Sequence, residues 1–347
     1  MYLQKKVFSI FSILTLTLLI AGCATRPELS TESASGSSSE TTDSNYPITI
    51  THALGETVIE SKPERIATIS WGNQDTPLAL GVLPVGVSTA NYGVTDGSGL
   101  LPWTKEAFEN LGVTQALLFD DVAGLDFEAI SDVQPDVILA AYSGITQEEY
   151  DLLSEIAPVV AYRTAPWQTF WRDQIIYDAM GIGLEAEGKA LVSDLEQLIE
   201  EKTATYPELN GIKAAFFYFN PTDLGKFYVY LPSDPRAAYL LDLGMEFPDS
   251  VKALTEDSSS FALELSAENV DRLDDIDLII TYGTDGLLES LQKDPLISTL
   301  PAVQNGSVAI IEDATPLAAS GTPSALSIPA TIDEYLAILA EAVKTDQ

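Results

Sequence analysis

The sequence predicts an α/β protein of two lobes, each built on a mainly parallel sheet, with a ligand cleft between them. Three observations indicate this. The chain has 347 residues, which is too long for one typical core. Short apolar segments alternate with helical ones, as in a parallel sheet covered on both faces. Finally, one unit is written twice, as "LDFEAISDVQPDVILAAY" at 125–142 and as "LSAENVDRLDDIDLIITY" at 265–282.

The first lobe is predicted over 47–183. It begins with an alternating segment that turns at Gly55, which is typical of a hairpin. Strands and helices then follow one another. We expect strands at 65–71, 82–87, 136–142 and 158–162, and helices at 75–81, 127–133 and 147–157.

The second lobe is predicted over 207–347 and repeats this order. Between the lobes, 184–206 places apolar residues at helical spacing and contains no proline, which predicts one long rigid helix. In the second lobe we expect strands at 212–219, 277–282 and 306–311, and helices or helical turns at 235–244, 267–273, 294–300 and 329–344.

The first 22 residues have the features of a signal peptide. Lys5 and Lys6 precede an apolar run of about 15 residues, which is too short to span a membrane comfortably. "LIAGC" resembles a bacterial lipobox, which implies a lipid anchor on Cys23, the only cysteine. Residues 23–46 are rich in Ser, Thr and Glu and are predicted to form a disordered tether. We therefore expect the protein on the outer face of the cytoplasmic membrane.

Composition restricts the partners and the chemistry. The chain has 17 Lys and Arg against 52 Asp and Glu, a net charge of −35, so it would repel nucleic acid. This charge favours a neutral or cationic small ligand, although it also suits a surface that is merely well solvated. The only histidine is His52, so we expect no metal site and no catalytic residue. An exported hydrolase and an adhesin lipoprotein are the alternatives of another class.

Several stretches resemble one family, in the same order along the chain. They are "THALGETVIESKPERIATI", "LALGVLPVGV", "QPDVILA", "IAPVVAY", "FYVYLPSDPRAAYLLDLG" and "TLPAVQNGSVAII". The chain thereby resembles the cluster A (class III) substrate-binding lipoproteins of iron–siderophore ABC importers. The resemblance implies two Rossmann-like lobes joined by one rigid helix. It also implies capture of a ferric siderophore and its delivery to an ABC permease for iron uptake, with iron bound only as its chelate and no cofactor. We expect a monomer.

Each copy of the repeated unit places a glutamate in the first turn of its helix. Glu128 follows Asp126, and Glu268 follows Ser266. A carboxylate there stabilises a helix by about 0.3–1 kcal/mol without any partner. The resemblance implies a further role, because in that family one exposed glutamate on each lobe docks against arginines of the permease. Glu264 is the fallback in the second copy.

Aromatic residues follow the predicted strands, where open α/β sheets bind their ligands. Any one of them could be a core or rim residue, but together they suit a large amphipathic guest. Tyr228 is the alternative to Tyr230, since both face the same side of an alternating strand. The predicted ligand-binding residues are Trp71, Trp103, Tyr142, Tyr218, Tyr230, Arg236 and Tyr282.

The few cations near the cleft favour a ferric hydroxamate. A ferric catecholate is strongly negative and would need a cluster of cations. The cleft candidates are only Arg163, Arg172, Lys226 and Arg236. A hydroxamate complex is neutral or cationic, which aromatic faces can bind. "APWQTFW" at 165–171 also resembles family members that take hydroxamates. A catecholate siderophore, haem and cobalamin are the alternatives.

Overall fold

The first lobe is built on a five-stranded sheet of order β5-β4-β3-β6-β7, in which every neighbouring pair is parallel. The computed structural model describes residues 46–121, 123–255 and 260–344, all within one compact unit. The strands are short and largely buried, as apolar runs predict. They are β3 (Ile66–Thr68), β4 (Gly86–Ser88), β5 (Leu118–Phe119), β6 (Val137–Leu139) and β7 (Val159–Val160).

Helices cover both faces of this sheet. Ile138 of β6 packs in one buried cluster with Ile130 of α3 and Leu153 of α4. Its neighbour Leu139 points to the other face, where Tyr177 of α5 packs. The helices are α1 (Asp75–Ala79), α2 (Pro102–Asn110), α3 (Phe127–Asp132), α4 (Gln147–Ser154) and α5 (Trp171–Gly181), and the predicted hairpin is β1 (Ile48–His52) and β2 (Gly55–Ile59).

The second lobe contains a five-stranded sheet of order β10-β9-β8-β11-β12. The pairs β8–β11 and β11–β12 are parallel, whereas β8–β9 and β9–β10 are antiparallel. Only residues 221–222 separate β8 from β9, and so short a connection allows only an antiparallel pair. The strands are β8 (Ala214–Asn220), β9 (Asp223–Tyr230), β10 (Ala262–Ser266), β11 (Leu278–Gly283) and β12 (Val308–Glu312).

The α/β prediction is therefore confirmed, and the antiparallel edge is an addition that the sequence did not indicate. Along β9, Phe227 and Val229 are buried whereas Tyr228 and Tyr230 are half-buried, as the alternation predicts. The surrounding helices are η1 (Pro207–Leu209), α7 (Pro235–Asp242), α8 (Asp249–Leu254), η2 (Ala267–Arg272), α9 (Leu287–Lys293), η3 (Ile297–Thr299), α10 (Pro301–Asn305) and α11 (Pro316–Ala319).

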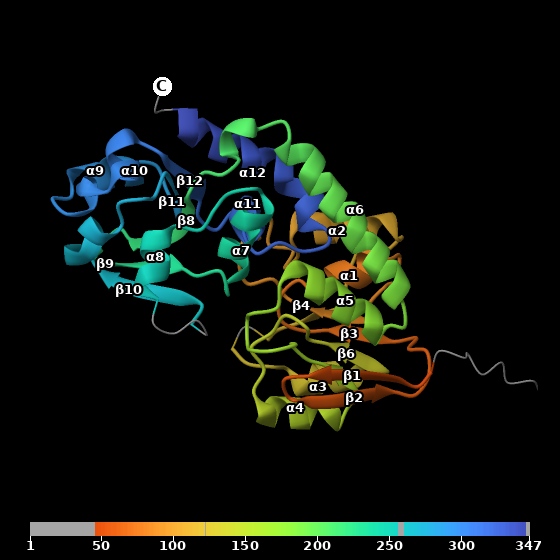
Figure 1. Ribbon diagram of the computed structural model, residues 1–347. Helices are drawn as coiled ribbons and strands as arrows, with labels where there is room; N and C mark the ends of the chain where they lie inside the picture. Colours follow the sequence, from red (N-terminus) through yellow and green to blue (C-terminus); the bar gives the residue numbers. More distant parts are fainter. Residues whose placement is uncertain (1–45, 122, 256–259, 345–347) are drawn as a thin grey trace, which may run out of the picture. The chain divides into compact units, whose positions relative to one another are not determined.

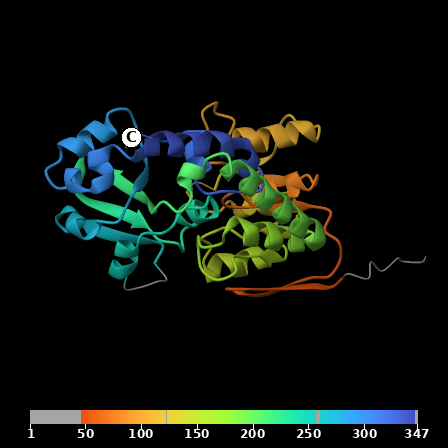
Figure 2. The same ribbon diagram turned by 45° about the horizontal axis from the view of Figure 1, so that its top comes forward.

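One long helix, α6 (Glu185–Thr203), leads from the first lobe to the second. Its buried residues Leu195 and Ile199 share a cluster with Trp171 of α5 and with Leu336 of the last helix, α12 (Ser327–Lys344). Figures 1 and 2 show α6, in green, running beside α12, in dark blue. The connecting helix is thus braced along its length by two others, which stiffens it.

The chain also returns to the first lobe late in the sequence, in residues 319–326, which we call the return segment. Leu326 packs with Leu78 and Phe108 of the first lobe. Ser324 donates a hydrogen bond to the buried carboxylate of Asp75. The predicted boundaries at 183, 184, 206 and 207 stay predictions, but this part of the range 207–347 packs against the first lobe.

The predicted signal peptide (1–22), Cys23 and nearly all of the tether (23–46) lie outside the described residues. Within the part of the chain that the structure describes, we find no helix with the length and apolar character needed to cross a membrane.

Candidate functional site

A cavity of about 540 Å³, the main cavity, opens where the strands of the first sheet end. Residues that line it follow every strand of that sheet, as expected for an open parallel sheet. Ser70 and Trp71 follow β3; Thr89 and Asn91 follow β4; Asp121, Gly124 and Leu125 follow β5; Tyr142, Gly144, Ile145 and Glu149 follow β6; and Trp167 follows β7.

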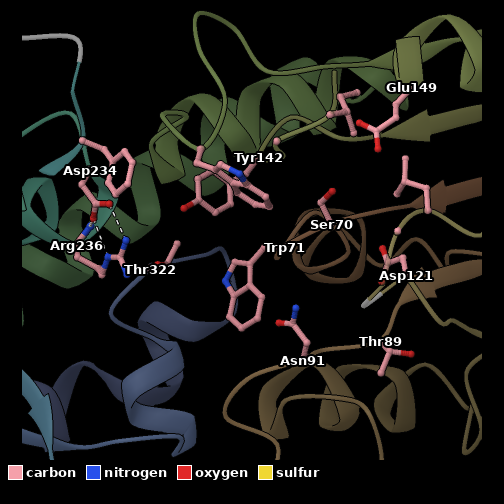
Figure 3. A pocket seen from close by; sticks show the side chains of 16 residues that line it. Ser70, Trp71, Thr89, Asn91, Asp121, Tyr142, Glu149, Asp234, Arg236 and Thr322 are labelled. Atoms are coloured by element: carbon pink, nitrogen blue, oxygen red, sulfur yellow. Dashed lines mark hydrogen bonds and ion pairs between the residues drawn. The ribbon is translucent and has the colours of Figure 1, made fainter. Parts of the chain in front are cut away.

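The opposite wall of the main cavity comes from the second lobe and the return segment. Asp234 and Arg236 lie at the start of α7, Phe261 precedes β10, and Thr322 belongs to the return segment. Figure 3 shows Trp71 between these two walls. The cavity therefore lies between the lobes, where the fold prediction places the cleft.

A second cavity of about 370 Å³, the side cavity, adjoins the first, and Trp71, Arg236 and Thr322 line both. Its wall is rich in tyrosine. The hydroxyl of Tyr92 donates to Oδ1 of Asp313 at 2.6 Å. Burial, together with this carboxylate, raises the pKa of Tyr92 to about 12, so the hydroxyl stays protonated. The remaining lining residues are Tyr218, Tyr230, Tyr282, Ala318 and Ala319.

The structure brings six of the seven predicted ligand-binding residues to these cavities. Trp71 and Arg236 line both of them, and Tyr142 lines the main cavity. Tyr218, Tyr230 and Tyr282 line the side cavity. Their placement agrees with the expected cleft, while their contact with a ligand stays a prediction.

Trp103 is the exception, because it is a core residue. It is only 7% exposed, and its indole Nε1 donates to Oδ2 of the buried Asp75 at 3.1 Å. The segment around it does not lie at the end of a strand, as was expected of the aromatic residues, but forms helix α2, which begins at Pro102. Trp103 packs with Leu101 and Ala319 in one buried cluster, behind the cavity-lining residue Trp71, and it lines neither cavity itself.

Trp167 also lines the main cavity, although the sequence indicated it only as part of "APWQTFW", the stretch that resembles family members that take hydroxamates. Its ring packs edge-on against Tyr142, with 5.3 Å between the centroids. Gly144 allows this, since a Cβ there would lie 2.2 Å from Nε1 of Trp167. The backbone of Trp167 has a φ of 59°, which is unusual for a non-glycine residue. Trp171, the other tryptophan of "APWQTFW", is buried in the core.

Arg236 is held in one position by three contacts. Its Nε and Nη2 donate to the two carboxylate oxygens of Asp234 at 2.8 and 2.7 Å. Its guanidinium carbon lies 4.0 Å from the ring centroid of Tyr230, which is a cation–π contact. Asp234 also caps α7, because Oδ1 accepts from the backbone N–H of Arg236 at 2.9 Å. Figure 3 shows this pair at one end of the main cavity.

Carboxylates outnumber cations in the described lining of the main cavity. Asp121, Glu149 and Asp234 face one guanidinium, that of Arg236. Asp121 accepts a hydrogen bond from Ser88, and burial raises its pKa. The other cations considered from the sequence pair elsewhere: Arg163 with Asp173, Arg172 with Glu196 and Asp242, and Lys226 with Glu264.

Comparison with known proteins identifies the family. Residues 66–315 match the profile of the periplasmic binding proteins, which is well over half of the chain. This chain is a member of the periplasmic binding protein family. The crystal structure of PiaA from Streptococcus pneumoniae TIGR4, in complex with ferrichrome, superposes on this binding protein with a TM-score of 0.83. PiaA is 52% identical, and the match covers 86% of this chain and 100% of PiaA.

More distant relatives of this binding protein come from Bacillus subtilis (strain 168). The iron-uptake system-binding protein is 26% identical, with 92% of this chain and 94% of the relative covered. The probable siderophore-binding lipoprotein YfiY is 23% identical over 96% of this chain and 98% of its own. The resemblance noted in the sequence is thus confirmed, and the family consists of binding proteins for transport and not of enzymes.

The two glutamates of the repeated unit are both exposed in this binding protein. Glu128 lies in the first turn of α3, which Asp126 caps by accepting from Ala129 N–H at 3.0 Å. Glu268 lies in the first turn of η2, a 3-10 helix capped by Ser266. The fallback residue Glu264 instead contacts Lys226 and Tyr228. Permease docking by Glu128 and Glu268 stays a prediction.

His52 is a structural residue of the N-terminal hairpin. It is buried, and its Nε2 lies 2.9 Å from Oγ1 of Thr57. Burial lowers its pKa, so the imidazole is neutral near pH 7. Among the described residues no group of three or more His, Cys, Asp and Glu is arranged to hold a metal ion.

Proposed function

We propose that this binding protein captures a ferric siderophore outside the cell and delivers it to an ABC permease for iron uptake. The observation that supports this most is the pair of adjoining cavities between the lobes, with aromatic walls and few cations. Their volumes, about 540 and 370 Å³, fall within the range of about 300–1,000 Å³ that is usual for small-molecule sites. PiaA, which is 51–52% identical, was crystallised with ferrichrome and is an iron uptake ABC transporter substrate-binding protein.

The charge of the lining favours a ferric hydroxamate as the guest. Ferrichrome is a siderophore of this class. Its complex is neutral, because three hydroxamate anions balance Fe³⁺. A tris-catecholate complex is a trianion, and the surplus of carboxylates around the main cavity would repel it. Trp71 and Tyr230 offer apolar faces, and the neighbouring hydroxyl and amide groups can donate hydrogen bonds.

The test is a titration of the purified protein that is followed by tryptophan fluorescence, since Trp71 and Trp167 line the main cavity. Ferrichrome should quench the emission, whereas a ferric tris-catecholate, haem and cobalamin should not. Tyr230→Ala should weaken binding about tenfold, through loss of an aromatic face. Tyr228→Ala is the matched control, because it lies on the same strand face but lines neither cavity. If no ferric hydroxamate binds, the proposal fails. Binding of a tris-catecholate alone would show that the guest is a catecholate siderophore instead.

Glu128 and Glu268 are proposed to dock the two lobes on the permease. Both are exposed, and charged contacts of this kind set the orientation of a partner. The double variant Glu128→Lys/Glu268→Lys should bind ferrichrome normally but abolish siderophore-dependent growth. The control is Glu148→Lys/Glu187→Lys, which reverses two other exposed first-turn glutamates and so alters charge and helix ends equally. Normal uptake in the first variant would refute docking.

Cys23 is proposed to carry the lipid anchor that holds the protein on the outer face of the cytoplasmic membrane. The "LIAGC" sequence supports this, and two Bacillus subtilis relatives are named lipoproteins. Cys23→Ser should release the protein into the medium, as an immunoblot of cell and medium fractions would show. Retention of the variant on the cells would contradict the anchor.

A further inference from the structure

The charge of Arg236 is balanced inside the wall of the cleft. Arg236 is the only Lys or Arg among the described residues that line the main cavity. Both of its bonds to Asp234 are short and form a bidentate pair. The side chain of Asp234 is only 3% exposed and that of Arg236 is 23% exposed, so water screens this pair weakly. A guest therefore meets a hydrogen-bonding group that carries almost no net charge.

We propose that Asp234 sets the charge selectivity of the cleft, because it neutralises Arg236 and so lets the site bind neutral or cationic ferric complexes while rejecting anionic ones. This inference rests on the proposed function and adds a residue that determines specificity. Asp234 holds Arg236 in place and balances its charge without needing to touch the guest.

The rest of the lining strengthens this effect. Asp121 and Glu149 add negative charge on the opposite wall, which the neutralised arginine does not offset. If Asp234 lost its charge, Arg236 would become a partly buried cation facing the cavity. One added positive charge attracts a trianion at about 10 Å strongly enough to raise its affinity about tenfold or more, even with substantial screening. A neutral complex would gain little.

Asp234→Asn removes the negative charge of residue 234 but should keep its role as the cap of α7. Asparagine caps a helix about as well as aspartate, so the start of α7 should persist. Asp242→Asn is the matched control. Asp242 accepts two hydrogen bonds from Arg172, at 2.8 and 2.9 Å, but lines neither the main nor the side cavity. Both variants change the net charge by the same amount and break one Arg–Asp pair.

The experiment measures the Kd of ferrichrome, which is neutral, and of ferric enterobactin, a tris-catecholate trianion, at low and at high salt. We expect the preference for ferrichrome to fall at least tenfold in Asp234→Asn at low salt and less at high salt. Asp242→Asn should keep the wild-type preference. In Asp234→Asn/Arg236→Gln, where both charges are absent, the preference should return close to that of the wild type.

Three results would overturn the inference: an unchanged preference in Asp234→Asn, an equal shift in Asp242→Asn, or a double variant whose preference for ferrichrome stays lowered or becomes stronger than that of the wild type. The double variant also decides the question if Asp234→Asn does not fold, because removing both partners leaves no unpaired buried charge. Failure of the wild type to bind ferrichrome would instead refute the proposed function, and this inference with it. Ferrichrome binding with an unaltered preference refutes the inference alone.

Discussion

Removing the hydroxyl of Ser324 should weaken the contact between the return segment and the first lobe. Ser324 donates to Asp75, a buried carboxylate that also accepts from Thr104 Oγ1 at 2.8 Å and from Trp103 Nε1 at 3.1 Å. Ser324 Oγ also accepts from the backbone N–H of Ser327 at 3.1 Å, where α12 begins. A hydrogen bond to a charged group contributes about 1.5–3 kcal/mol and a helix cap about 1 kcal/mol.

Ser324→Ala should therefore lower the free energy of unfolding by about 3 kcal/mol, or the Tm by about 5 °C for a chain of this size.

The loss of stability in Ser324→Ala should depend on pH. Burial raises the pKa of Asp75 to about 6, although its hydrogen-bond donors, Ser324 among them, act to lower it. Without Ser324 this pKa rises further, so the folded variant retains its proton to higher pH than the wild type. Stability falls with pH where the folded state binds more protons than the unfolded state. The gap between variant and wild type should thus widen as the pH rises through 6.

Urea unfolding followed by circular dichroism at pH 5 and pH 7.5 measures this gap. Ser320→Ala is the control, since Ser320 is equally buried and donates to the backbone oxygen of Leu317 at 2.7 Å but does not bond to Asp75. It should cost about 1 kcal/mol at both pH values. Equal losses for Ser324→Ala at the two pH values, or a loss no larger than that of the control, would refute the reasoning.

Two further changes test the cleft and the core beneath it. Gly144→Ala places a Cβ 2.2 Å from Nε1 of Trp167, so the indole must move. The affinity for ferrichrome, measured by the same fluorescence titration, should therefore fall about tenfold. Gly225→Ala, at an exposed strand position, is the control and should leave the Kd unchanged. Phe216 is fully buried, and its ring centroid lies 4.9 Å from that of Tyr282. Phe216→Ala should lower the free energy of unfolding, measured by urea titration, by about 3–5 kcal/mol. A loss below about 1 kcal/mol would show that the neighbouring rings collapse into the space.

The sequence predicted most strands of the two sheets, though not β5 or β10, and most of the cleft, because those features follow from local patterns. Apolar runs mark buried strands, and residues just beyond the carboxyl end of a parallel strand reach the cleft in any open α/β sheet. Trp71, Tyr142 and Tyr282 were found in this way, each at or just beyond the end of a predicted strand. The alternation along β9 likewise put Tyr228 and Tyr230 on one face, and only the structure shows that Tyr230 is the one that lines a cavity.

The misses depend on contacts that no local pattern records. Trp103 was predicted in the cleft with the aromatic residues that follow the strands, whereas Pro102 begins a nine-residue helix whose inner face is buried. The return segment reaches Asp75 from 249 positions away in the chain, so only the folded structure reveals it. Asp234 stands two residues before Arg236 in the sequence, yet spacing alone cannot show that the two side chains pair.

The path of the chain also limits how this protein can be recombined. It leaves the first lobe through α6, comes back in residues 319–326, and departs again along α12. Consider a chimera made by joining two relatives at one point in α6. Its first lobe would come from one parent, but residues 319–326, which complete the core of that lobe, would come from the other parent. Transplanting a lobe intact therefore requires three crossover points, with Leu326 and Ser324 kept with the lobe that they seal.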